Sequence, residues 1–109
     1  MEAINEYEIK NLANILNLLG DESRLQIIIY LNDKESCVNE IINNVNLSQP
    51  LVSHHLKVLK DANIVSSTKC GKKVIYKIVD LQIKQLLDYS IKNITHEVSV
   101  WLKFVTINY

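Results

Sequence analysis

The sequence predicts a single, mainly helical domain with one small β-hairpin. Three observations lead to this. Hydrophobic residues make up 48% of the chain, with only two Gly and one Pro, a composition typical of packed helices. Apolar residues recur at helical spacing in several segments, and only the region around Gly71 is rich in β-branched residues instead. With 109 residues, the chain is long enough for one core but too short for two ordinary domains, so residues 1–109 are expected to form one domain.

The first two helices are predicted at residues 5–19 and from residue 22 onward. The apolar stripe of the first helix lies at Leu12, Ile15, Leu16 and Leu19. Gly20 is expected to close this helix in the manner of a C′ glycine. Asp21 then stands as the N-cap of a second helix, whose run from Leu25 to Leu31 is apolar enough to be deeply buried.

Two short helices are expected next. Ser36 can cap a helix that ends near Asn44, and residues 45–47 are too few for another element, so they form a turn. Ser48 caps the following helix, with Pro50 harmless in its first turn. Its buried side is predicted at Leu51, Val52, Leu56, Val58 and Leu59. Two short helices joined by a tight turn form a helix-turn-helix unit.

The pattern then changes to that of a two-stranded hairpin. Residues 64–68 and 74–79 are β-branched and partly alternating, and they flank the Gly-containing turn 69–73 with its three lysines. The sequence therefore predicts a hairpin with a basic tip.

A long last helix is expected from Leu81, capped by Asp80, to about residue 105. At 1.5 Å per residue it would span roughly 35 to 40 Å, longer than so small a core needs. We therefore expect the terminal helices, about 5–19 and 81–105, to form the interface of a homodimer, although a stripe of this kind can also pack only on its own core. The candidate interface residues are Leu12, Leu16, Leu87, Ile91, Ile94, Val98 and Trp101.

The distribution of charge favours a nucleic-acid partner even though the net charge is zero. Between Ser48 and Lys77 there are six lysines and one acidic residue, so one face can be strongly basic. The sequence contains no apolar stretch long enough for a membrane span, and the polar, acidic N-terminus is unlike a secretory signal, so we expect a cytoplasmic protein.

Several motifs together resemble the ArsR-type (ArsR/SmtB) family of arsenic- and metal-responsive repressors, over roughly residues 10 to 80. The most specific is Ser48-Gln49-Pro50-Leu51-Val52-Ser53-His54-His55-Leu56, preceded by Leu19-Gly20-Asp21-Glu22-Ser23-Arg24-Leu25 and Cys37-Val38-Asn39-Glu40-Ile41 and followed by Gly71-Lys72-Lys73-Val74-Ile75-Tyr76. The resemblance implies a winged helix-turn-helix transcriptional repressor that binds a near-palindromic operator as a homodimer and occludes a promoter. The helix from Gln49 to Lys60 would then enter the major groove.

The candidate DNA contacts lie on the exposed side of this helix and at the hairpin tip. They are Gln49, Pro50, Ser53, His54, Lys57, Lys69, Lys72 and Lys73. Gln49 can make two hydrogen bonds to an adenine edge, whereas lysines suit phosphates. The alternatives are that the adjacent histidines form only a polar face and that the hairpin lysines are a solvated turn.

The effector sites implied by the family are incomplete in this chain. The run Cys37-Val38-Asn39 lacks the second thiolate of the Cys-Val-Cys arsenic site, and the positions of the zinc site are Asp80, Gln82, Asn93 and His96, of which two are amides. Cys37, Asp80 and His96 therefore remain only weak metal candidates. Cys37 and Cys70 are expected to lie too far apart for a disulfide within one subunit, so no cofactor is expected and the effector stays unidentified.

The sequence does not favour an enzyme, because it contains no Gly-rich phosphate loop, nucleophile elbow or acid pair. The stronger rival is a winged-helix module that binds proteins instead of DNA. The basic segment, together with Gln49, Ser53 and His54, argues against that rival.

Overall fold

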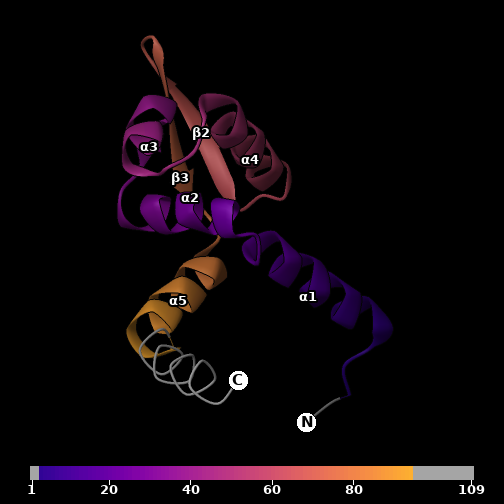
Figure 1. Ribbon diagram of the computed structural model, residues 1–109. Helices are drawn as coiled ribbons and strands as arrows, with labels where there is room; N and C mark the ends of the chain where they lie inside the picture. The colour runs from indigo at the N-terminus through magenta and orange to yellow at the C-terminus, as the bar shows by residue number, and fades with distance from the viewer. Residues whose placement is uncertain (1–2, 95–109) are drawn as a thin grey trace.

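The computed structural model describes residues 3–94. Its elements, in chain order, are α1 (Glu6–Leu19), α2 (Glu22–Asp33), β1 (Ser36–Cys37), α3 (Val38–Asn44), α4 (Gln49–Asp61), β2 (Val65–Cys70), β3 (Lys73–Ile78), α5 (Leu81–Tyr89) and a π-helical turn, Ser90–Ile94 (Figure 1). The predicted mainly helical fold with a small β-hairpin is confirmed.

The helices begin where polar side chains can satisfy their first backbone N–H groups. Asn5 accepts from Glu8 N, Asp21 from Arg24 N, and the carboxylate of Asp80 from the backbone of Gln82 and Ile83. Gly20 does follow the last residue of α1, but its φ is −80°. It is therefore right-handed, and the expected C′ glycine conformation is not formed.

The sheet has three strands rather than the expected two. Its order is β1-β3-β2, with both pairings antiparallel, and Ser36 lies opposite Tyr76. The prediction that Ser36 caps a helix was wrong, because Ser36 belongs to β1 and Cys37 occupies the N-cap position of α3. The hairpin turn is also tighter than expected. Only Gly71, with φ of +64°, and Lys72 lie between β2 and β3, a conformation that suits glycine.

The core is formed where α2, α3 and α4 meet the sheet. Its fully buried apolar side chains are Ile27, Ile28, Ile41, Val52, Leu56 and Leu59. Two residues that were predicted to be buried are exposed, Ile29 of α2 by 39% and Leu51 of α4 by 37%, while His55 is only 5% exposed. Because His55 lies three residues after Val52 and next to Leu56, the helical period places it on the inner face.

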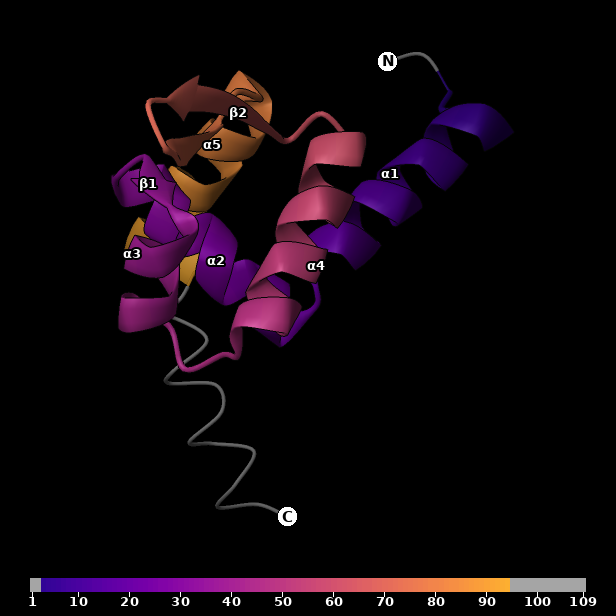
Figure 2. The same cartoon turned by 90° about the horizontal axis from the view of Figure 1, so that it is seen from above.

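The helices α1 and α5 lie on the side of the molecule opposite the hairpin tip, with α1 extending away from the body (Figure 1). Seen from above, α2 lies between α3 and α4 (Figure 2). The helix expected from Leu81 to about 105 is α-helical as far as Tyr89 and continues as the π-helical turn Ser90–Ile94. Residues 95–109 of that prediction lie outside the described residues. None of the helices between residues 3 and 94 combines the length and the apolar character that crossing a membrane would require.

Candidate nucleic-acid interface

The outer face of α4 carries polar side chains at the spacing that brings them together. All five predicted contacts on this helix are exposed: Gln49, Pro50, Ser53, His54 and Lys57. Residues four apart are neighbours on a helix, so Gln49, Ser53 and Lys57 line up along one row. The first turn is anchored by Ser48, whose Oγ accepts from Leu51 N at 3.3 Å. The opposite face of α4 is fully buried, which holds the outer row in a fixed orientation.

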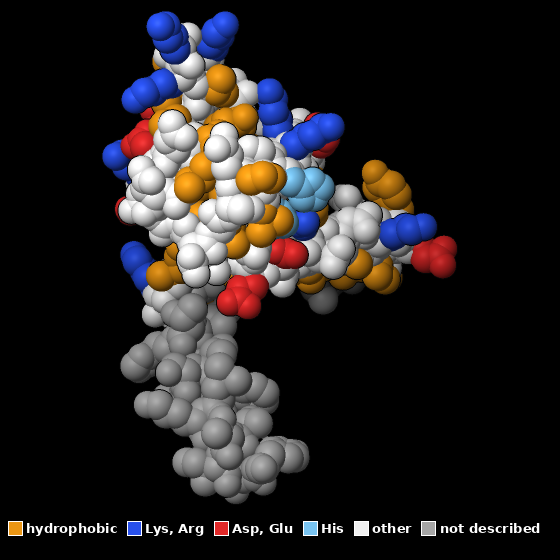
Figure 3. All heavy atoms as spheres, turned by 45° about the horizontal axis from the view of Figure 1, so that its top comes forward, with side chains coloured by type: hydrophobic (Ala, Val, Ile, Leu, Met, Phe, Trp, Pro, Cys, Tyr) orange, Lys and Arg blue, Asp and Glu red, His pale blue; other side chains and the backbone are white. Residues whose placement is uncertain are grey.

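The hairpin presents its lysines beyond α4. Lys69, Lys72 and Lys73 are all exposed, and Figure 3 shows basic side chains around the hairpin tip, with a histidine and further basic side chains on the same face. The strands pair tightly up to the turn, where Cys70 lies opposite Lys73. The structure therefore gives a convex helix face beside a basic projection.

One contact that the sequence did not reveal joins these two parts. Lys60 Nζ donates to Ser67 Oγ at 2.7 Å, and it connects the last turn of α4 to β2. A basic residue near the end of a helix also suits the helix dipole. The only signal in the sequence was the position of Lys60 in the last turn, which does not name its partner.

The inner face of α4 carries a second unpredicted feature, the histidine His55. Its Nδ1 accepts from Arg24 Nε at 3.4 Å, and its Nε2 lies 3.9 Å from Asp21 Oδ1. Burial lowers the pKa of His55 below its ordinary value of 6.5; Arg24 and His54 also lower it, while the Asp21 carboxylate raises it. The ring is therefore neutral at pH 7. The pKa of Asp21 is itself lowered, chiefly by the backbone N–H of Arg24.

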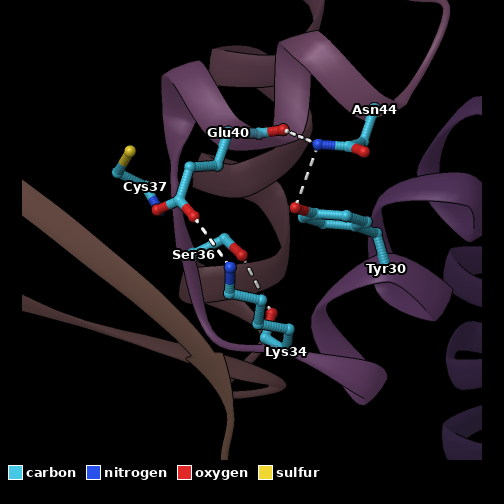
Figure 4. Close-up of polar contacts among 6 residues, drawn as sticks. All are labelled: Tyr30, Lys34, Ser36, Cys37, Glu40 and Asn44. Carbon is cyan, nitrogen blue, oxygen red and sulfur yellow. Dashed lines mark hydrogen bonds and ion pairs between the residues drawn. The ribbon is translucent and has the colours of Figure 1, made fainter.

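Polar contacts connect both ends of α3 to neighbouring segments of the chain (Figure 4). Glu40 accepts from Cys37 N at 3.2 Å and lies 3.3 Å from Lys34 Nζ. The backbone N–H of Cys37 is the largest cause of the lowered pKa of Glu40. At the other end, Asn44 Nδ2 donates to Tyr30 Oη at 3.1 Å and to Glu40 O at 2.8 Å. Both ends of this short helix are thus tied to α2 or the segment that follows it.

Two of the weak metal candidates, Cys37 and Asp80, lie among the described residues. Cys37 is 6% exposed, and the Asp80 carboxylate caps α5 through two backbone N–H groups. His96 lies outside the described residues. Across residues 3–94, no three His, Cys, Asp or Glu side chains gather as a metal site would need. Both Cys37 and Cys70 are free thiols, the first buried and the second exposed.

The predicted interface residues fall into three groups. Leu12, Leu16 and Ile91 are exposed by 52%, 53% and 42%, whereas Leu87 is 5% exposed and belongs to the subunit's own core. The side chain of Ile94, together with Val98 and Trp101, lies outside the described residues. The exposed leucines of α1 are accompanied by Tyr7 and Ile9, which are 77% and 57% exposed.

Comparisons with known proteins agree with this geometry. The family described as "Bacterial regulatory protein, arsR family" matches residues 21–67. An arsenical resistance operon repressor of Staphylococcus xylosus is 36% identical over 85 residues, covering 78% of each chain. The SmtB transcriptional repressor of Mycobacterium tuberculosis is 33% identical over 75 residues, which are 69% of this chain but only 56% of that protein.

A solved structure gives the same fold. The crystal structure of the transcriptional repressor BigR from Xylella fastidiosa superposes with a TM-score of 0.72 at 28% identity, covering 79% of this chain and 90% of that one. These relatives are transcriptional repressors and not enzymes. The helix-turn-helix interpreted from the sequence, residues 36–60, lies within the matched segment.

Proposed function

This chain belongs to the ArsR family of bacterial regulatory proteins, and on that premise we propose that it is a sequence-specific repressor that binds a near-palindromic DNA site as a homodimer. The observation that carries the proposal is the polar outer face of α4 beside a hairpin with three exposed lysines. A helix of this kind fits the major groove, and lysines next to it can reach phosphates. Occupation of a promoter would repress transcription, and the activity belongs in the cytoplasm, where promoter DNA lies.

The residues divide into those that read bases and those that hold the backbone. Gln49 and Ser53 lie in the first turns of α4, where side chains reach base edges. Gln49 suits an adenine, with one hydrogen bond donated and one accepted. His54 can reach a base or a phosphate, and Lys57, one turn further along, suits a phosphate. Lys69, Lys72 and Lys73 would contact the phosphates in or along the minor groove.

Dimerisation is supported by the apolar surface that α1 leaves exposed. Leu12 and Leu16 lie one turn apart and are each about half exposed. The helix α1 lies on the side of the molecule away from the hairpin tip (Figure 1), so a partner seated on it would leave both copies of α4 free. The two α4 helices would then bind half-sites about 34 to 36 Å apart, or a multiple of one helical turn.

The proposal gives no metal role to Cys37 or Asp80. A single buried thiol cannot supply the several ligands that a soft metal ion needs. The carboxylate of Asp80 is already engaged by two backbone N–H groups. Titration of the purified protein with arsenite, zinc and a persulfide donor, read as release of bound DNA, tests this part. Release at low micromolar concentration would contradict it.

Substitutions of Gln49 and Lys72 test the DNA contacts. Binding is measured by fluorescence anisotropy on a duplex selected by the protein from a random library and on a scrambled duplex. Gln49→Ala should reduce the difference in affinity between the selected and the scrambled duplex. Lys72→Ala should weaken binding to both duplexes equally, and it should reduce the slope of log affinity against log salt concentration by about one. As a control, Lys10→Ala removes the same charge from an exposed position on α1, and it should change neither the affinity for the two duplexes nor its salt dependence. Equal effects of Gln49→Ala and Lys72→Ala would contradict these roles.

Binding to a protein partner instead of DNA is the rival function. Retention on heparin that is lost with added salt distinguishes the two, because phosphate-like contacts release counterions. Failure of the library to yield any preferred duplex, together with weak heparin retention, would favour the rival.

A further inference from the structure

His55 is a buried polar residue on a helix whose other buried residues are apolar. It is 5% exposed, next to Leu56 at 1% and one turn from Val52 at 0%. A histidine among such neighbours costs free energy unless its ring nitrogens are hydrogen-bonded. Its ring is also separate from the outer face of α4 that is proposed to contact DNA. The proposed DNA contacts therefore do not explain why a histidine occupies this buried position.

Arg24 connects the ring of His55, on α4, to α2 and α1. Arg24 Nε, on α2, donates to its Nδ1 at 3.4 Å, and Arg24 Nη1 donates to the carbonyl of Leu18, on α1, at 3.2 Å. Asp21, the N-cap of α2, places Oδ1 3.9 Å from His55 Nε2 and accepts from Arg24 N at 2.9 Å. One guanidinium thus connects the end of α1 to the middle of α4 through one imidazole. We call Asp21, Arg24 and His55 the junction cluster.

This arrangement requires an uncharged ring. Nδ1 can accept from Arg24 only while it carries no proton, so the ring proton resides on Nε2, facing Asp21. A second proton, on Nδ1, would place an N–H donor of the ring opposite the Nε–H donor of Arg24, with no acceptor between them. The charged or titratable groups that face the ring are Arg24 and Asp21 from α2 and its cap, and His54 from α4, with ring centroids 5.6 Å apart. Two of these three disfavour a positive imidazole, and burial acts in the same direction.

We propose that the neutral imidazole of His55 is a positioning group that fixes α4 against the α1–α2 junction, so that DNA binding by the outer face of α4 depends on His55 being uncharged. The inference rests on the proposed function. With 13 residues, α4 is about 20 Å long, so a small rotation at the junction cluster displaces its first turn, where Gln49 lies. Because α1 carries the exposed apolar surface, the same cluster also relates each α4 to the proposed dimer interface.

The exposed neighbour His54 is a second imidazole, on the outer face of α4 among the proposed DNA contacts. It is therefore replaced in both of the proteins that are compared. The experiment therefore compares His54→Gln with the double variant His54→Gln/His55→Gln. A glutamine at 55 keeps an acceptor for Arg24 but cannot become charged.

The measurement is the affinity for the duplex selected at pH 7.5, followed from pH 7.5 to pH 5.5 at constant ionic strength. His54→Gln should bind more weakly at pH 5.5 than at pH 7.5, by at most about tenfold, because one proton linked to binding changes affinity by at most tenfold per pH unit and only the unit below pH 6.5 lies in this range. The double variant should be nearly flat over this range. Arg24→Gln, which removes the donor to both His55 and Leu18, should bind several-fold more weakly already at pH 7.5, with a reduced response to acid.

Two results would overturn the inference. One is the same acid response in His54→Gln and in the double variant, which would assign the response to other groups. The other is a loss of helical circular dichroism in step with the loss of binding, which would mean that His55 supports only folding. Absence of any selected duplex for the wild-type protein at pH 7.5 is different, because it contradicts the proposed function itself.

Discussion

The helices α1 and α4 are similar in length and both amphipathic, yet they are covered in different ways. On α4, Val52, Leu56 and Leu59 are at most 1% exposed, whereas on α1 only Leu19 is buried and Leu12 and Leu16 are about half exposed. The apolar stripe of α4 is therefore satisfied within the subunit, and that of α1 is not. An amphipathic pattern therefore predicts that one face of a helix is buried, but it does not predict whether the same subunit or a partner buries that face.

The outer faces of the two helices differ as well. The outer face of α4 is polar and held rigidly by a buried inner face, which suits a surface that must match a duplex. The helix α1 exposes apolar side chains, including Leu12 and Leu16, and it extends away from the body of the molecule (Figure 1). In the proposed function, each helix therefore has one exposed face that binds a partner: α4 binds DNA and α1 binds a second subunit.

The largest effect is expected from shortening a core side chain of α4. Leu56→Ala should lower the free energy of unfolding by about 2 to 5 kcal/mol, because it leaves a cavity among fully buried residues. Urea unfolding followed by circular dichroism measures it. The matched change on α1, Leu12→Ala, should have an effect that disappears on dilution, since its contacts are with a partner. An equal loss for Leu12→Ala at every protein concentration would contradict the comparison.

A charged face on α1 should separate the subunits without unfolding them. Leu12→Glu combined with Leu16→Glu removes two leucines whose burial contributes about 1.5 to 3 kcal/mol each, so sedimentation should shift from dimer to monomer. Helical circular dichroism should remain. Asn14→Glu with Asn17→Glu adds the same charge on the opposite side of α1, where both residues are exposed, and serves as the control. A wild-type protein that is already monomeric, or a control that dissociates equally, would contradict the assigned interface.

Substitution of the N-cap residues of α1 and α4 should have a smaller effect. Ser48→Ala and Asn5→Ala each remove a side-chain acceptor for a backbone N–H, a loss of about 1 kcal/mol. For Ser48 the loss should appear in subunit unfolding and in DNA binding. For Asn5 it should appear mainly as faster amide exchange in the first turn of α1. Fast exchange in α4 on substitution of Asn5 would show that the two helices are not independent.

The smallest effect is expected in the pH dependence of unfolding. The pKa of His55 is lower in the folded state than its ordinary value of 6.5. The contribution of His55 to the free energy of unfolding is therefore complete above pH 6.5 and is lost as the pH falls below that value. Asp21 and Glu40, with pKa values below 3.8 and 4.5, add a second loss in more acidic solution. His55→Gln should abolish the first loss and keep the second. Urea unfolding at pH 7.5, 6.5, 5.5 and 3.5 measures both, and an unchanged first loss in His55→Gln would contradict the assignment.

Local signals predicted most of the elements correctly. The caps at Asp21, Ser48 and Asp80 act over two or three residues, so they can be recognised without knowing the rest of the fold. The same holds for Gly71 in the hairpin turn. The exposed positions on α4 followed from the helical period, apart from Leu51, which is exposed where burial was expected.

The errors arise where distant segments meet. Ser36 resembles a helix cap in the sequence, but its pairing with Tyr76, forty residues away, makes it part of a strand. His55 resembles one of two polar surface residues, and only Arg24 and Asp21, supplied by α2 and its cap, explain its burial. Leu87 has the spacing of an interface residue but is taken up by the subunit's own core.

The sequence by itself determined the helix starts, the turns, the basic segment and the family of this protein, because each depends on neighbouring residues or on a specific motif. The tertiary structure alone decided which apolar stripes are covered, which histidine is buried and how α4 is joined to α1 and to the hairpin. The physical reason is that hydrogen bonds such as those of His55 and Lys60 join residues that are brought together only when the helices and strands pack, and no local pattern names the partner.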